Sequence, residues 1–228
     1  MRILLFLLTL SVAAPAVAQT KLEGLAGAGL SLRHTTSANL AEIAGAAGYS
    51  DKNDVSPGSL GFDMRAGVLL PVDLELDATG TLAAGGLALS DIERRYFSSE
   101  PETVGSSLAA GAYGSIRYAP ELSDGLRLLV GPSAGAQRLA ASSPAGSAHL
   151  DLLGVGLDAG FRLRLHHISR VVDGHLELLL SGRRELPLDA HAQTSADNVL
   201  FSGTSGSAPA IWSFGLSAQY VFSFHAKD

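Results

Sequence analysis

The fold is decided by Leu60-Gly61-Phe62-Asp63-Met64-Arg65-Ala66-Gly67-Val68-Leu69-Leu70 and by the run after Pro71, Val72-Asp73-Leu74-Glu75-Leu76-Asp77-Ala78-Thr79. In both runs apolar side chains alternate with charged or small ones. Successive side chains of a β-strand point to opposite faces, so each run predicts a strand with one apolar and one polar face. A charge at every second position does not suit a dry protein core, but it suits the polar interior of a membrane barrel.

The same alternation occurs in eight segments, and 26 glycines scattered through the chain argue against helices, because each costs about 1 kcal/mol in a helix interior. The segments are as long as the roughly 9–11 residues that a tilted strand needs to cross a bilayer. We therefore predict an all-β fold, an eight-stranded antiparallel up-and-down transmembrane β-barrel. Its strands are Lys21–Arg33, Leu60–Leu70, Val72–Leu82, Ser106–Tyr118, Leu126–Arg138, Leu153–Leu165, His175–Arg183 and Ile211–Phe224.

The connections between these strands alternate in length, which is typical of long outer loops and short periplasmic turns. Short connections are expected around Pro71, at Ala119–Gly125 and at His167–Gly174. Long polar loops are expected at Thr35–Ser59, Ser90–Thr103, Ala140–Ala148 and Pro187–Pro209. With an even number of strands, both chain ends would then lie in the periplasm.

The N-terminus has the pattern of a secretory signal peptide. Arg2 is followed by the apolar stretch Ile3–Val12, and Ala16-Val17-Ala18 fits a cleavage site. The apolar stretch is too short for a membrane-spanning helix. We expect residues 1–18 to be the signal and residues 19–228 to be one barrel domain, exported to the outer membrane of a Gram-negative bacterium.

Charged side chains on the expected inward face are six acids and six arginines. Unpaired buried charges are costly, so equal numbers predict mutual pairing, and an eight-stranded barrel has room inside only for its own side chains. We predict a filled polar interior. The residues are Asp63, Arg65, Asp73, Glu75, Asp77, Arg117, Arg127, Asp158, Arg162, Arg164, Glu177 and Arg183.

Aromatic side chains fall near the expected rims of the barrel, as in the aromatic girdles of membrane barrels. Phe62 and Trp212 are expected at the outer edge. The periplasmic edge would hold Tyr118, Tyr220, Phe222 and Phe224.

The composition argues against several classes of function. The formal net charge of −6 does not favour nucleic acid as a partner, and the absence of cysteine excludes thiol-ligated metals. Adjacent strand residues point to opposite faces, so His166 and His167 are not expected to chelate one ion. Asp73, Glu75 and Asp77 share a face and have the spacing of a cation site, but arginine partners explain them equally well. We expect no cofactor, no metal and no catalytic residue.

The last predicted strand, Trp212–Phe224, alternates apolar residues and ends in an aromatic. In this it is similar to the C-terminal insertion signal of outer-membrane barrels, although His225-Ala226-Lys227-Asp228 follow. The whole architecture resembles the small eight-stranded barrels of the OmpA transmembrane-domain and OmpX type. The resemblance implies the barrel-assembly machinery as a partner. Pro132 departs from the pattern, because a proline inside a strand removes a ladder donor and predicts a bulge or an early end of pairing.

These features predict a non-enzymatic envelope or surface protein that acts through its extracellular loops. Its expected partners are outer-membrane lipid, lipopolysaccharide and an extracellular ligand at the loops. Three alternatives remain open on the sequence alone: a porin-like channel for small solutes, a barrel enzyme that modifies lipid A, and a soluble periplasmic β-domain.

Overall fold

The computed structural model describes residues 22–35, 58–85, 106–143, 146–204 and 211–225 of the 228-residue chain. All regular structure in these residues is β-strand. None of the described segments forms a helix long and apolar enough to cross a membrane. The expected signal peptide at 1–18 and most of the expected loops at 35–59 and 90–103 lie outside the described residues.

One sheet contains all ten strands. The two short strands are β5 (Glu121–Ser123) and β9 (Val199–Gly203). The long strands are β1 (Glu23–Thr35), β2 (Gly58–Leu70), β3 (Leu74–Gly85), β4 (Ser106–Tyr118), β6 (Leu126–Ser143), β7 (Gly146–Ser169), β8 (Val172–Thr194) and β10 (Ile211–His225).

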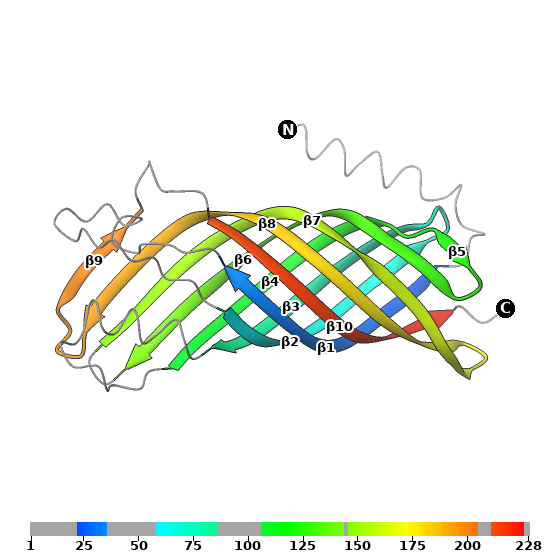
Figure 1. The fold of residues 1–228 in the computed structure, drawn as a ribbon, viewed down its shortest axis with the longest axis horizontal. Coiled ribbons are helices and arrows are strands. Elements are labelled where there is room, and N and C mark those ends of the chain that lie inside the picture. The colour runs from blue at the N-terminus through cyan, green and yellow to red at the C-terminus, as the bar shows by residue number, and fades with distance from the viewer. Residues whose placement is uncertain (1–21, 36–57, 86–105, 144–145, 205–210, 226–228) are drawn as a thin grey trace.

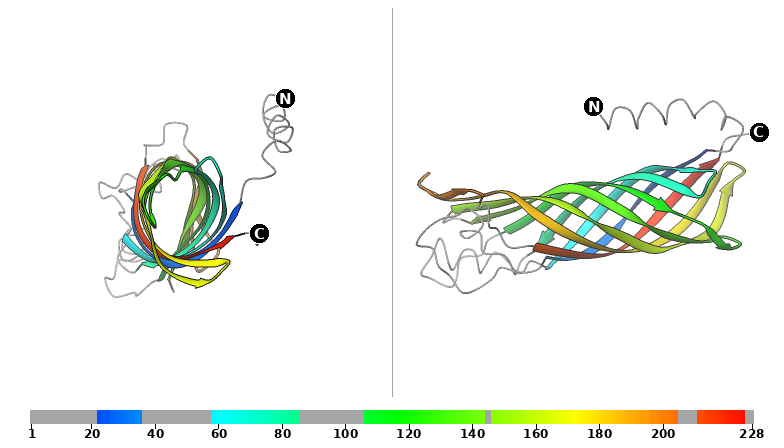
Figure 2. Two further views of the ribbon diagram at one scale, coloured as in Figure 1. Left: turned by 90° about the vertical axis from the view of Figure 1, so that its right-hand side faces the viewer. Right: turned by 90° about the horizontal axis from the view of Figure 1, so that it is seen from above.

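The long strands close into a barrel (Figures 1 and 2). They pair antiparallel in the order β10-β1-β2-β3-β4-β6-β7-β8, and β8 pairs with β10. Starting from Leu25, paired residues lead round the barrel and return to β1 at Thr35, ten residues farther along, through Gly67, Asp77, Ser115, Ser133, Gly156, Arg183 and Ser213. This shear, with eight strands, tilts them by about 40° and leaves an interior just wide enough for side chains. The predicted eight-stranded antiparallel barrel is confirmed.

The polarity of the two faces of the barrel wall is the reverse of that in a soluble protein, because apolar side chains face outward and charged side chains face inward. Outward-facing apolar side chains are more than 60% exposed at Met64, Leu157 and Leu180. Inward-facing Glu75 and Glu177 are fully buried. An apolar exterior around a charged interior suits a barrel surrounded by lipid.

The two ends of the barrel differ. At the end that we call the turn end, Glu23 pairs with His225, and tight turns at 71–73, 124–125 and 170–171 connect the strands. Asp73 takes φ of 54° in the first of these turns. At the opposite end, the loop end, residues 36–57 separate β1 from β2 and residues 86–105 separate β3 from β4, whereas only residues 144–145 separate β6 from β7.

Three strands continue beyond the loop end, where the sequence analysis predicted loops. β6 and β7 form a hairpin in which Ser142 pairs with Ser147, and β8 continues to Thr194 and pairs with β9. Figure 1 shows this projection next to the label β9; we call it the extension (residues 139–143, 146–152, 187–194 and 199–203). The prediction of loops at 140–148 and 187–209 is therefore wrong for most of these residues. Continued ladder pairing and buried side chains such as Leu150 and Ala190 hold them in strands.

Pro132 lies inside β6 without ending the strand. It pairs in register with Leu157 of β7, but the β4–β6 ladder is interrupted beside it, between the pairs Ser115–Ser133 and Tyr118–Val130. Because proline has no N–H to donate, the break falls on one side of the strand only.

Candidate functional site

Six charged side chains from five strands meet in the barrel interior, towards the turn end. β2, β3, β4, β7 and β8 supply them, and their side chains are 0–1% exposed. Alternation places them inside, because each occupies an inward position of its strand. We call this group the central network: Arg65, Glu75, Asp77, Arg117, Arg162 and Glu177.

Each acid in the central network faces more than one arginine. Arg162 Nη2 lies 2.6 Å from Glu75 Oε2 and 2.7 Å from Glu177 Oε2, and its Nε donates to Glu177 Oε2 at 2.9 Å. Arg117 Nη2 donates to Asp77 Oδ2 at 2.5 Å. Arg65 forms ion pairs with Glu75 and Glu177. Three positive and three negative charges balance, which is the condition under which buried ions are tolerated.

A second group of polar side chains lies between the central network and the loop end. Asp158 accepts hydrogen bonds from Arg183 Nη2 at 3.0 Å and from two serine hydroxyls, those of Ser115 and Ser133. The Tyr113 ring lies 4.1 Å from the Arg183 guanidinium carbon, a cation–π contact.

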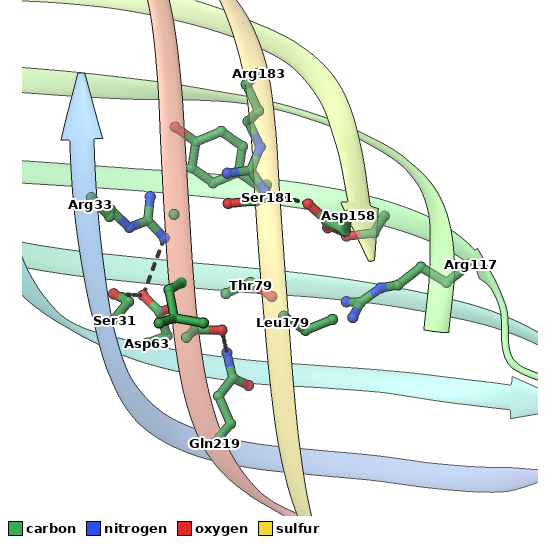
Figure 3. Close-up of a pocket in the computed structure, with 15 residues that line it drawn as sticks. Ser31, Arg33, Asp63, Thr79, Arg117, Asp158, Leu179, Ser181, Arg183 and Gln219 are labelled. Carbon is green, nitrogen blue, oxygen red and sulfur yellow. Dashed lines mark hydrogen bonds and ion pairs between the residues drawn. The ribbon is translucent and has the colours of Figure 1, made fainter. Parts of the chain in front are cut away.

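Arg33 and Asp63 continue this group on the other side of the barrel. Arg33 Nη2 lies 3.3 Å from Asp63 Oδ1, which also accepts from Ser31 Oγ at 3.1 Å. Figure 3 shows Arg33, Asp158 and Arg183 around a shared cavity.

Two small cavities border the central network. The cavity on the loop side measures about 30 Å³ and is lined by Arg117, and the one at the turn end measures about 60 Å³ and is lined by Arg162. One water needs about 10–15 Å³ of such volume, so each holds only a few waters. The central network therefore separates two water-sized spaces, and its side chains fill the barrel cross-section between them.

The structure places the twelve predicted interior residues in two environments. Nine are buried inside the barrel: Asp63, Arg65, Glu75, Asp77, Arg117, Asp158, Arg162, Glu177 and Arg183. The other three lie at the turn end and are partly exposed. There Arg127 Nη1 lies 3.1 Å from Asp73 Oδ1, and Arg164 pairs with the exposed Asp124.

Sequence reasoning missed three inward-facing charges: Arg33, Glu185 and, at the turn end, Asp173. Arg33 ends the first predicted strand and has the inward parity of that strand. Glu185 lies two residues beyond Arg183, where the predicted strand stopped, and it accepts a hydrogen bond from Ser213 Oγ at 2.5 Å. Applying the inward parity to the first predicted strand would have found Arg33, and extending the seventh by one inward step would have found Glu185.

The six predicted interfacial aromatics all face outward in the described structure. Phe62, Tyr118, Trp212, Phe222 and Phe224 are exposed and Tyr220 is half-buried. Trp212 lies near the loop end of β10, while Phe222 and Phe224 lie at its turn end. The adjacent pair His166–His167 divides between partners: His166 Nε2 lies 3.2 Å from the Tyr220 hydroxyl, and His167 Nδ1 lies 2.6 Å from Asp173 Oδ1.

Comparisons with known proteins match the architecture only. No family model matches the chain, and neither does any curated protein sequence. Among solved structures, Neisserial surface protein A is 13% identical and covers 87% of this chain and 95% of its own, with a TM-score of 0.45. Ail, the attachment invasion locus protein of Yersinia pestis, is 14% identical over 87% of this chain and 97% of its own, with a TM-score of 0.38. A major outer membrane protein from Thermus thermophilus is 12% identical over 86% and 99%, with a TM-score of 0.46.

Proposed function

We propose that the protein is an integral outer-membrane barrel of a Gram-negative bacterium, in which a sealed cylinder anchors non-enzymatic surface segments. The central network is the observation that carries this proposal. Its charge-balanced side chains are 0–1% exposed and fill the lumen, so the cylinder is not built to pass solutes. Function then belongs to the segments that this rigid scaffold holds outside the bilayer.

The height of the apolar exterior supports a membrane location. On β7 the outward face is apolar from Leu153 to Leu165. Twelve residues at about 3.3 Å each, tilted by about 40°, rise about 30 Å, close to the hydrocarbon thickness of a bilayer. Directly beyond Leu153 on the same outward face, Asp151 pairs with Arg138, both of them charged. This change from apolar to ionic side chains marks the loop-end boundary of the lipid.

The orientation follows from the position of the chain ends. Both ends of the described chain lie at the turn end, which an exported chain would leave in the periplasm. The extension then lies beyond the apolar band on the cell-surface side, where we expect the extracellular ligand to bind. β10 supplies the segment that the barrel-assembly machinery would read, with Phe224 followed by one further strand residue, His225.

Conductance in planar lipid bilayers tests the sealed cylinder. We expect the purified, refolded protein to produce no stable open level. A reproducible open state would overturn the sealed-anchor proposal and favour the small-solute channel.

Single cysteines test the orientation, because the chain contains none of its own. Ser195→Cys lies at the exposed β8–β9 turn and Ser123→Cys at the exposed turn end. On intact cells, a membrane-impermeant maleimide should label Ser195→Cys and should label Ser123→Cys only after the outer membrane is permeabilised. The reverse pattern, or labelling of both sites on intact cells, would contradict the proposed topology.

A further inference from the structure

Two histidines and two aspartates face one another across β7 and β8 in the extension. His149 pairs directly with His191, and Asp151 pairs directly with Asp189. A bulge at Leu188 shifts β8 by one residue just before Asp189, because Leu152 pairs with Pro187 and Asp151 with Asp189. The bulge turns Asp189 and His191 to the same outward face as His149 and Asp151. Without it, the two strands would present these residues to opposite faces.

The potential ligand atoms of this cluster are already close together. One ligand atom each from His149, Asp151 and Asp189 lie within 4.8 Å of one another. His149 Nε2 lies 3.3 Å from Asp189 Oδ2, and the imidazoles of His149 and His191 stack at 5.2 Å between centroids. Ligand atoms about 2.0–2.1 Å from a tetrahedral zinc ion are about 3.3 Å apart, so the first pair already has this spacing.

The charges of the cluster also favour a cation. Asp151 and Asp189 lie directly opposite, an arrangement that is unfavourable for like charges on a sheet. Arg138 donates to both oxygens of Asp151, at 2.6 and 2.5 Å, and fixes that carboxylate in place. Each carboxylate oxygen keeps a further lone pair, so Asp151 can still bind a metal, as carboxylate ligands with a hydrogen-bonded outer partner commonly do. Side chains of the three residues are 24–41% exposed, so an ion can reach them from solvent.

We propose that His149, Asp151 and Asp189, with His191 as the fourth ligand, bind one divalent transition-metal ion of the zinc type on the outer face of the extension. Imidazole with carboxylate is the donor set that zinc prefers, whereas calcium and magnesium take oxygen ligands only. The site uses nothing from the barrel interior and does not depend on which side of the membrane the extension lies.

Zinc binding to the refolded full-length protein in detergent micelles tests the site. Isothermal titration with Zn²⁺ should give one equivalent per chain, and Co²⁺ should produce the visible absorption of a four-coordinate site. We expect His149→Ala and Asp189→Asn each to weaken Zn²⁺ binding at least about tenfold. Ca²⁺ in place of Zn²⁺ should give no comparable binding.

A double variant at the other end of the barrel is the matched control. His166→Ala with His167→Ala removes two imidazoles at the turn end and should leave the titration unchanged, while retained heat-dependent gel mobility shows that every variant is folded. Unchanged Zn²⁺ affinity in folded His149→Ala, loss of binding in the control, or equal affinity for Ca²⁺ would each overturn the site. None of these outcomes bears on the conductance or labelling tests of the proposed function.

Discussion

Replacing Glu177 with glutamine probes the central network at its most connected acid. One oxygen of Glu177 faces Arg65 and Arg117, and the other lies 2.9 and 2.7 Å from two nitrogens of Arg162. The substitution keeps the shape of the side chain but leaves three guanidinium groups against two carboxylates. It also turns an amide N–H₂ towards groups that are themselves donors.

The cost follows from the burial of this site. Breaking a fully buried ion pair by removing one partner typically costs about 3–5 kcal/mol, because the remaining charge is left uncompensated. Glu177 is fully buried, so we expect Glu177→Gln to lower the free energy of unfolding by about that amount. Adding Arg162→Gln restores charge balance. The double variant should therefore lose less than the sum of the two single variants, by about 0.5–3 kcal/mol.

Trp212 offers a direct assay. It is the only tryptophan, and it lies outward on β10, so its emission reports transfer from lipid to water during urea unfolding in phospholipid vesicles. Glu121→Gln is the matched control, since Glu121 pairs with Arg127 at 3.5 Å on the exposed rim and should cost less than about 1 kcal/mol. A loss below 1 kcal/mol for Glu177→Gln, or strict additivity in the double variant, would refute the reasoning.

Three further predictions concern the wall and its turn end. Gly156→Ala should abolish folding as judged by heat-dependent gel mobility, because its Cβ would lie 2.1 Å from the Gly182 carbonyl oxygen. Gly80→Ala, with open space around it, should fold normally. Equal folding of the two variants would contradict the close approach of the strands at Gly156. Leu157→Arg, in the middle of the apolar exterior, should lower the free energy of unfolding in vesicles by about 2–4 kcal/mol. Leu122→Arg, at the turn end, should lower it by at most about 1 kcal/mol. Similar losses in the two variants would argue against the proposed membrane position. Burial opposes ionisation of Asp173, but hydrogen bonds with His167 and His225 outweigh the burial and lower the pKa of Asp173. This carboxylate therefore stabilises the fold at pH values above 3.8, and the stabilisation is lost as the pH falls below that value. The difference in unfolding free energy between wild type and Asp173→Asn should therefore shrink between pH 6 and pH 3, and a difference that grew on acidification would rule this linkage out.

The barrel wall was predictable because alternation is a local property. From Leu60 to Val68, apolar residues alternate with charged residues or glycine, so the face of most of them can be predicted from residue type alone, although the apolar Leu69 lies inside. The extension was not predictable in the same way. Residues 140–143 are alanines and serines, and Pro187, Asp189 and His191 have the composition of a loop, although ladder pairing holds them in β8.

The sequence predicts which charged residues face the barrel interior, but it does not predict which of them form ion pairs with one another. The alternation along each strand places Arg65, Glu75 and Glu177 on the inward face, and in the structure these three side chains form ion pairs. Which arginine pairs with which acid depends on the shear of the barrel. The shear is the sum of the registers of all neighbouring strand pairs, and a local sequence pattern does not contain this sum. The cluster of His149 and Asp189 depends in the same way on the bulge at Leu188. Pro187 beside it is typical of a bulge, but a bulge is not expected in a segment predicted to be a loop.

The central network also bears on how the cylinder can assemble. Arg65 and Glu177 are separated by 112 positions along the chain, and their strands β2 and β8 are brought to one lumen only when the first strand, β1, pairs with the last, β10. A partly inserted sheet would hold bare guanidinium groups and carboxylates against hydrocarbon, which is prohibitive. Intermediate states with some strands in the bilayer and others outside are thereby disfavoured, and insertion and closure are coupled into one concerted event.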